Sequence, residues 1–464
     1  MAEPKSEILP RKTALTIVAV LAMLAAVPLL PGKKLSGLDP LWIERLFLGK
    51  DFSSRSATVP KPQDALAQVD KQTDSAGPEP HVPNLIVPPG SLDAFYQALA
   101  RTDQKEPGAI TRILHYGDSP TTADSITADV RSLLQARFGD AGHGFLLIAP
   151  PWAWYGHRGV RLSASGWTIE PASMNRAKDG VHGLGGVSFR GDQGAESHVR
   201  LPDAAHTQVV VYFWAQPDGG TFELRSGDQV LQAVSTAAEE PHPEFAEVAL
   251  PPGTREVDLV VTAGQVRAFG YRFDKPGPGI QYSSIGINGA QVQMLVRYFQ
   301  VNQWTANLRH EHPDLIILNY GTNESIFPDY VHKQYPAELR IVISRLRAAL
   351  PDTSIMLMSP MDRGVESMDG EITTPETLPA LVEVQRQIAA ETGCAFFDTF
   401  EAMGGRGTMA RWYNQRPRLV SADFMHPLPA GAAKVGALFE QSLVNAYNSY
   451  WSTDGKPAEA RAAK

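Results

Sequence analysis

The chain has 464 residues, a length that suggests two or three domains. Apolar residues make up 43% and charged residues 20%, which is typical of soluble globular proteins. Its formal net charge of −8 argues against a nucleic-acid partner, because neutralising phosphates requires a basic face. The single cysteine, Cys394, excludes an internal disulfide, and its apolar neighbours favour a packing role over a reactive thiol.

The N-terminal segment differs from the rest of the chain. Residues 13–30 carry no charge and follow basic residues, a pattern typical of either a signal peptide or a membrane anchor. We favour an uncleaved hydrophobic helix within residues 1–31, because no convincing small-x-small cleavage site follows. In both cases the bulk of the chain is expected to be exported. Residues 32–90 are rich in Pro, Asp, Ser and Gln, which predicts a flexible tether.

An α/β pattern begins near residue 91 and continues to residue 154. A short helix is expected over residues 92–101 and a strand over 110–116, which ends in Gly-Asp-Ser. Apolar residues at helical spacing then predict a helix over residues 122–138. Ser119, the last residue of Gly-Asp-Ser, is therefore expected where a strand stops and a helix begins.

Residues 155–276 lose this helical periodicity. Strand-like runs alternate with Gly- and Pro-containing turns, which predicts an inserted β-sandwich or jelly roll of about 120 residues. The clearest runs are 209–214, 221–225, 257–262 and 266–273. We interpret the aromatic group just before the insertion, Trp152, Trp154 and Tyr155, as core packing at the domain junction, with stacking on a sugar ring as the alternative.

Strand and helix alternate again over residues 277–451, which predicts a parallel, doubly wound sheet with ligands at the carboxyl ends of its strands. Ser119, Gly289 and Asn323 all fall at such ends. Strands are expected at 280–287, 314–320, 354–359 and 395–398, and helices at 290–310, 333–350, 375–392 and 430–450. Residues 452–464 are polar and are expected to be frayed.

The sequence offers each part of a nucleophilic serine site. A serine hydroxyl needs a base, the base needs an orienting carboxylate, and the tetrahedral intermediate needs donors for its oxyanion. Asp423 precedes His426 by three residues, a spacing that lets its carboxylate reach back to the imidazole. Each motif alone also has a simpler explanation: a helix N-cap at Ser119, a turn at Asn323 and an ordinary loop pair at Asp423 and His426.

Gly-Asp-Ser, a glycine at a strand end, Gly-x-Asn and Asp-x-x-His occur in the block order of the SGNH (GDSL-type) hydrolases, and the chain resembles that superfamily. The resemblance implies a three-layer, flavodoxin-like α/β domain and a mechanism without metal or cofactor. Ser119 would be the nucleophile, His426 the general base and acid, and Asp423 its orienting partner. The oxyanion hole would consist of the Ser119 and Gly289 backbone N–H groups and the Asn323 side-chain amide.

Residues 91–450 also resemble the Gram-negative periplasmic peptidoglycan O-acetylesterases, through residues 134–145, a carbohydrate-binding-like β insertion and residues 286–290. The resemblance implies an O-acetylesterase that acts on an O-acetylated envelope polysaccharide. We expect it in the periplasm, anchored to the inner membrane by residues 13–30 or secreted if they are cleaved, without an obligate protein partner. The alternatives are an O-acetyltransferase acting on an envelope polysaccharide and a non-catalytic glycan-binding protein.

Two further features bear on the site. Pro120 follows the proposed nucleophile and lacks a backbone N–H, but in the SGNH scheme the serine's own N–H is the donor, so the oxyanion hole is expected to survive. Proline also suits the first turn of a helix. The segment 310–312, His-Glu-His, resembles a metal-binding fragment, but without further ligands we expect a solvated helix end and no metal site.

Overall fold

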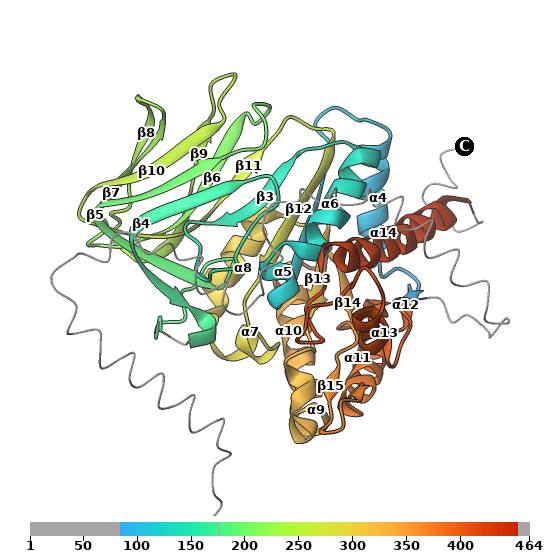
Figure 1. The fold of residues 1–464 in the computed structure, drawn as a ribbon. Coiled ribbons are helices and arrows are strands. Elements are labelled where there is room, and N and C mark those ends of the chain that lie inside the picture. Colours follow the sequence, from blue (N-terminus) through green and yellow to red (C-terminus); the bar gives the residue numbers. More distant parts are fainter. Residues whose placement is uncertain (1–83, 175, 453–464) are drawn as a thin grey trace, which may run out of the picture. The chain divides into compact units, whose positions relative to one another are not determined.

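The computed structural model describes residues 84–174 and 176–452 (Figure 1). The expected hydrophobic helix at 13–30, almost all of the expected tether and nearly all of the expected C-terminal tail lie outside these residues. Among the helices described, none combines the length and the apolar character that crossing a membrane requires.

A six-stranded sheet forms the centre of the α/β part (Figure 1). Its strands, from edge to edge, are β1 (Leu85–Ile86), β17 (Ala395–Phe397), β14 (Ser354–Met358), β13 (Leu315–Asn319), β2 (Ile110–Gly117) and β12 (Gly279–Gly286). Only β1 is antiparallel to its neighbour. In chain order the five parallel strands are arranged 2-1-3-4-5, a flavodoxin-like order whose switch point, where ligands bind, lies between β2 and β13.

Helices cover both faces of this sheet, because its strands carry apolar side chains on both sides. Ile113 and Leu315 belong to one apolar cluster and the adjacent residues Leu114 and Ile316 to another. The first cluster includes residues of α4 (Asp93–Asp103), α6 (Ser125–Phe138) and α14 (Pro429–Ser452); the second includes residues of α8 (Val301–Glu311), α10 (Tyr335–Ala349) and α11 (Thr377–Thr392). The expected three-layer α/β architecture is confirmed.

Two predicted helices are interrupted. The helix expected over 122–138 is divided into α5 (Ser119–Thr122) and α6, because Asp124 between them adopts a left-handed backbone with φ 50°. The single helix expected over 290–310 is wrong: the structure has α7 (Gln293–Arg297) and α8. Between them the Gln300 N–H donates to the Gly180 carbonyl oxygen, and His182 Nδ1 is hydrogen-bonded to the Tyr298 carbonyl oxygen. These contacts with a distant segment replace helical hydrogen bonds.

Several short elements were not predicted. They lie mainly in the connections around β13, β14 and β17, where apolar periodicity is too short to identify them. They are α9 (Pro328–Lys333), α12 (Thr399–Ala402), α13 (Thr408–Asn414) and the small hairpin of β15 (Val365–Glu366) and β16 (Ile372–Thr373). Strand β1 was also not predicted: it pairs with β17, so the expected flexible tether over residues 32–90 is wrong at this strand.

The inserted region forms an antiparallel β domain (Figure 1). An inserted β domain was expected, and its sandwich or jelly-roll arrangement stays a prediction. Its strands are β3 (Gly142–Leu147), β4 (Arg161–Pro171), β5 (Val187–Arg200), β6 (Gln208–Ala215), β7 (Thr221–Ser226), β8 (Gln229–Ser235), β9 (His242–Ala249), β10 (Glu256–Ala263) and β11 (Gln265–Asp274). All nine are connected in one sheet, because β11 pairs with β5 through its first residues and with β6 and β3 through its last. β3 belongs to this sheet although it precedes residue 155, the predicted start of the insertion.

The end of α8 packs against the β domain. Glu311 is 1% exposed and is paired with Arg272 at 3.2 Å, while the His310 ring is stacked on Phe245 with ring centres 3.7 Å apart. The expectation of a solvated helix end at 310–312 is therefore wrong for its first two residues. A buried carboxylate needs a charged partner, and here the β domain supplies it.

Candidate active site

Ser119 lies at the end of β2, beside the switch point of the sheet. Asp118 is the N-cap residue of α5, Ser119 is its first residue, and Pro120 occupies the first turn as expected. The Thr122 N–H donates to the Asp118 carbonyl oxygen at 2.9 Å and closes this turn. The serine is therefore held by a strand on one side and a short helix on the other.

His426 and Asp423 lie in the tight loop before α14. Phe424 in this loop has a left-handed backbone with φ 55°, which costs a non-glycine residue about 1–2 kcal/mol. The Gly364 N–H donates to the Phe424 carbonyl oxygen at 2.8 Å, and the Tyr413 ring packs edge-on against the phenyl ring. These contacts stabilise the strained turn that brings Asp423 back toward His426.

A continuous chain of hydrogen bonds joins the three predicted catalytic residues. Ser119 Oγ lies 2.7 Å from His426 Nε2, and His426 Nδ1 lies 2.6 Å from Asp423 Oδ2. The other carboxylate oxygen, Oδ1, accepts the Met425 and His426 N–H groups at 3.0 Å each and the Ser421 hydroxyl at 2.5 Å. A carboxylate fixed in this way favours the proton on Nδ1, which leaves Nε2 free to accept the serine proton.

The electrostatics of the pair suit a general base. The hydrogen bond and charge of Asp423 raise the pKa of His426 above the usual 6.5. Burial opposes ionisation of Asp423, but its hydrogen bonds from His426, Ser421 and Met425 outweigh burial and hold its pKa well below the usual 3.8. The side chains of His426 and Asp423 are 42% and 49% exposed, so water reaches both.

Asp118 is buried beside Ser119. Burial raises its pKa to about 6, and the hydrogen bond from Thr322 and the charge of His426 offset part of this rise. The Asn323 side-chain amide donates to Asp118 Oδ2 at 3.5 Å and to the Ala290 carbonyl oxygen at 2.9 Å. Asp118 and Asn323 thus link the turn that carries Ser119 to the loops after β12 and β13.

Glycines allow the loop after β12 to approach Ser119. A Cβ on Gly286 would lie 2.0 Å from the Thr122 backbone nitrogen, so only glycine lets β12 end against α5. Gly289 has φ 68°, and no atom lies within 4 Å of a Cβ built on it, so its position is open. The structure therefore gathers Ser119, Gly289 and Asn323 at one end of the sheet.

Glu324 is fully buried next to Asn323 and was not predicted as a site residue. Its Oε1 accepts the Val292 N–H at 2.7 Å and so ties the Asn323 loop to the Gly289 loop. Burial raises the pKa of Glu324 to about 8. A glutamate is most often exposed, and nothing in the residues around it marks this one as buried.

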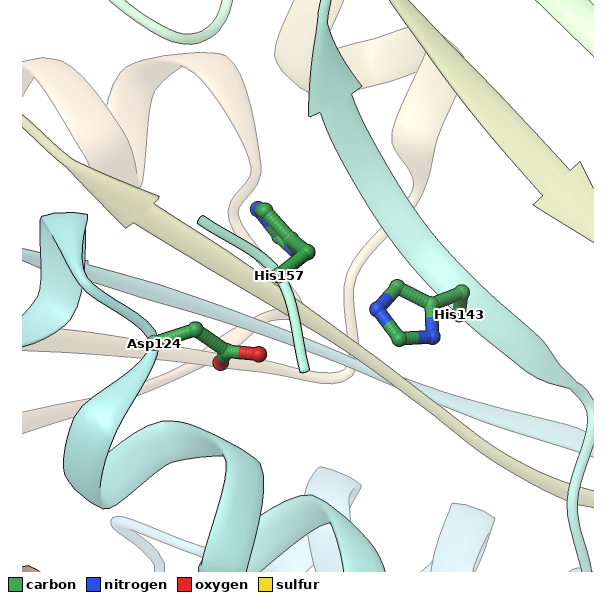
Figure 2. Close-up of side chains that lie close together, drawn as sticks. All are labelled: Asp124, His143 and His157. Atoms are coloured by element: carbon green, nitrogen blue, oxygen red, sulfur yellow. The ribbon is translucent and has the colours of Figure 1, made fainter. Parts of the chain in front are cut away.

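A second polar cluster lies next to the turn that carries Ser119. Asp124, His143 and His157 point toward one another, with candidate ligand atoms within 4.8 Å (Figure 2). The Asp124 carboxylate already accepts two hydrogen bonds from Arg131, at 2.6 and 3.1 Å, and one from the Arg158 N–H at 2.8 Å. Because the guanidinium would repel a metal cation, this arrangement favours a buried salt bridge that fastens the loop carrying His157 and Arg158.

Comparison with known proteins finds a related family and a related fold. Residues 260–434 match the GDSL-like lipase/acylhydrolase family. A solved structure of a peptidoglycan O-acetylesterase matches with a TM-score of 0.67 at 23% identity, over 79% of this chain and 99% of that one. The family match and the shared fold support an SGNH-type hydrolase domain. The family match includes Gly289, Asn323, Asp423 and His426 but not Ser119, which precedes most of the β domain in the sequence.

Other solved structures are more distant. A salicylyl-acyltransferase from a tetracycline biosynthetic pathway matches at a TM-score of 0.30 and 15% identity, over 65% of this chain and 97% of that one. An acetyl xylan esterase matches at a TM-score of 0.28 and 14% identity, over 36% and 81%. Similarity at this level carries no argument about the SGNH-type domain. A sequence search of curated proteins gives no significant match.

Proposed function

We propose that the protein is a carbohydrate O-acetylesterase that acts through an acyl-Ser119 intermediate. The family match and the fold support an esterase of the SGNH carbohydrate type. The observation that carries the proposal is the hydrogen-bonded chain from Ser119 through His426 to Asp423, with distances of 2.7 and 2.6 Å. This arrangement makes a serine hydroxyl nucleophilic at neutral pH.

The proposed reaction has two halves. His426 Nε2 takes the Ser119 proton while Oγ attacks the acetyl carbonyl carbon, and the sugar oxygen leaves with that proton. A water molecule then attacks the acyl-serine with His426 again as base, which releases acetate and restores Ser119. The Ser119 and Gly289 N–H groups and the Asn323 amide would hold the oxyanion in both halves, and Asp423 would stabilise the imidazolium.

An O-acetylated envelope polysaccharide is the proposed substrate class. The solved structure with the same fold is described as a peptidoglycan O-acetylesterase, which supports an envelope glycan as substrate here. We place the protein in the periplasm or cell envelope, held at the inner membrane by residues 13–30. The mass of the mature protein tests this placement, because a cleaved signal peptide would remove that segment.

The exposure of the catalytic pair favours hydrolysis over acetyl transfer. A transferase must protect its acyl-serine from water, whereas His426 is 42% exposed and Asp423 is 49% exposed. An O-acetyltransferase that uses the same site remains the second candidate. A non-catalytic glycan-binding protein has no requirement for a Ser119–His426 bond of 2.7 Å.

Acetate release by the full chain tests the proposal. O-acetylated peptidoglycan, acetylated xylan and 4-nitrophenyl acetate serve as substrates, each with and without an added glycan acceptor. Ser119→Ala is expected to abolish release without lowering the melting temperature, while the matched control Ser442→Ala, a helical serine bonded to the Leu438 carbonyl oxygen, keeps full activity. Full activity of Ser119→Ala would overturn the assignment, and acetyl transfer to the acceptor in place of release would favour the transferase.

A further inference from the structure

The segment 152–158 lies next to two loops of the candidate site, the one that carries Gly289 and the one that follows His426. On one side, the Trp154 indole N–H donates to Asn288 Oδ1 at 3.1 Å, and Asn288 directly precedes Gly289. On the other side, residues 156–158 line a cavity of about 370 Å³ together with Pro427, which follows His426, and Pro429. One loop therefore contacts the residue before Gly289 and shares a cavity with the residue after His426.

This segment is fastened to the nucleophile turn. The Gly156 N–H donates to the Thr122 carbonyl oxygen at 3.3 Å, and the Arg158 N–H donates to Asp124 at 2.8 Å. Asp124 is the buried carboxylate of the polar cluster behind this turn (Figure 2), so that cluster serves to hold the loop. Tyr155 adds a hydrogen bond between its hydroxyl and the Leu147 N–H at 2.8 Å. These bonds hold residues 154–158 in place before any substrate arrives.

Trp154 is the exception to the predicted core packing. Its neighbours Trp152 and Tyr155 are partly buried and pack against the core, as expected, whereas Trp154 is 53% exposed. It is the only tryptophan in residues 84–174 and 176–452 with more than half of its surface exposed. Leaving so large an apolar surface in water is unfavourable, and a fixed, exposed indole beside a catalytic site is suited to covering the apolar face of a ligand.

We propose that residues 152–158 form a sugar-binding platform, in which the Trp154 indole stacks on a pyranose ring of the acetylated glycan. A second ring of the same glycan would occupy the cavity between residues 156–158 and Pro427, whose volume is within the range of small-ligand sites. The platform rests on the proposed function, because it orients a carbohydrate ester at Ser119. Since the indole is already held by Asn288, little conformational entropy is lost on binding.

Two measurements on the full chain test the platform. The first compares kcat/KM for soluble O-acetylated peptidoglycan fragments with kcat/KM for 4-nitrophenyl acetate. Trp154→Ala is expected to lower kcat/KM for the glycan about tenfold more than kcat/KM for the small ester, which corresponds to the loss of one aromatic contact. Trp154→Phe, which keeps an aromatic face but loses the N–H bond to Asn288, is expected to recover most of the glycan value.

The matched control is Trp451→Ala. Trp451 packs on Tyr450 in the last turn of α14, 22 residues or about 33 Å along the helix from Pro429. This variant should match the wild type on both substrates. An equal loss on both substrates in Trp154→Ala would mean that the tryptophan only positions the Gly289 loop, and no loss on the glycan would mean that it does not contact sugar. Either result overturns the platform.

The second measurement separates the platform from the esterase activity. Ser119→Ala and the double variant Ser119→Ala/Trp154→Ala are titrated with the same fragments by calorimetry, and the double variant is expected to bind about tenfold more weakly. Failure of the wild type to release acetate would refute the proposed function and not the platform. Equal binding by the two variants, or no binding by either, would refute the platform.

Discussion

Replacing Asp423 with Asn is the most informative change at the candidate site. Asn keeps the size of the side chain and can still accept, through its oxygen, the bonds that Asp423 Oδ1 now accepts from the Ser421 hydroxyl and the Met425 and His426 N–H groups. It then places an amide N–H₂ against His426 Nδ1, where the carboxylate now accepts at 2.6 Å. The imidazole must carry its proton on Nε2 and can no longer accept the proton of Ser119.

The size of the effect follows from the exposure of the pair. In a buried triad the wrong tautomer costs about 10⁴-fold in kcat. Here the Asp423 side chain is 49% exposed and that of His426 is 42% exposed, so water can reorganise around the imidazole and soften the loss. We expect kcat to fall about 10²–10³-fold, which corresponds to about 2.7–4 kcal/mol of transition-state stabilisation.

The pH profile gives a second, independent readout of Asp423→Asn. The neutral imidazole is the active base, so kcat/KM of the wild type should rise as the pH increases through the pKa of His426, which Asp423 raises above 6.5. Removing the carboxylate lowers that pKa and moves the rising limb to lower pH. Initial rates with 4-nitrophenyl acetate from pH 5 to 9 measure both effects. Less than a tenfold loss in kcat, or an unmoved limb, would refute the role given to Asp423.

Three further predictions follow from the geometry. Asn323→Ala should lower kcat about 10²–10³-fold with little change in KM, as measured by steady-state kinetics, because the proposed oxyanion hole would lose one donor. Gly289→Ala should lower the free energy of unfolding, measured by urea titration, by about 1–2 kcal/mol. The backbone φ of 68° is unfavourable for alanine, although the new Cβ would meet open space. Arg131→Met should lower the free energy of unfolding by about 3–5 kcal/mol in the same assay, because it leaves the buried Asp124 carboxylate, 0% exposed, without its ion-pair partner. The control Lys333→Ala removes an exposed ion pair with Asp329, whose side chains are 69% and 90% exposed, and should lower it by less than about 0.5 kcal/mol.

The sequence was most informative where its patterns are long. Alternation of apolar strands and amphipathic helices predicted the parallel sheet and its two helical layers, and turn signals predicted the inserted β domain. The helix over 290–310 failed because its interruption depends on hydrogen bonds from residues near Gly180, more than 100 positions earlier. No local pattern carries that information.

The candidate site divides in the same way. The predicted residues Ser119, Asp423 and His426 are hydrogen-bonded as a chain, and their spacing in sequence was the signal. Glu324 was missed because its role comes from burial against the Val292 N–H, a property of the folded chain. Trp154 was grouped with its aromatic neighbours, since composition does not distinguish an exposed indole from a packed one.

Covalent labelling of Ser119 tests the central claim most directly. The full-length wild type, Ser119→Ala and His426→Ala are treated with a serine-reactive fluorophosphonate, and the modified peptide is identified by mass spectrometry. A nucleophile activated by His426 predicts one labelled peptide, which contains Ser119, no label in Ser119→Ala and strongly slowed labelling in His426→Ala. Labelling of another residue, or equal labelling rates in the wild type and His426→Ala, would contradict the account.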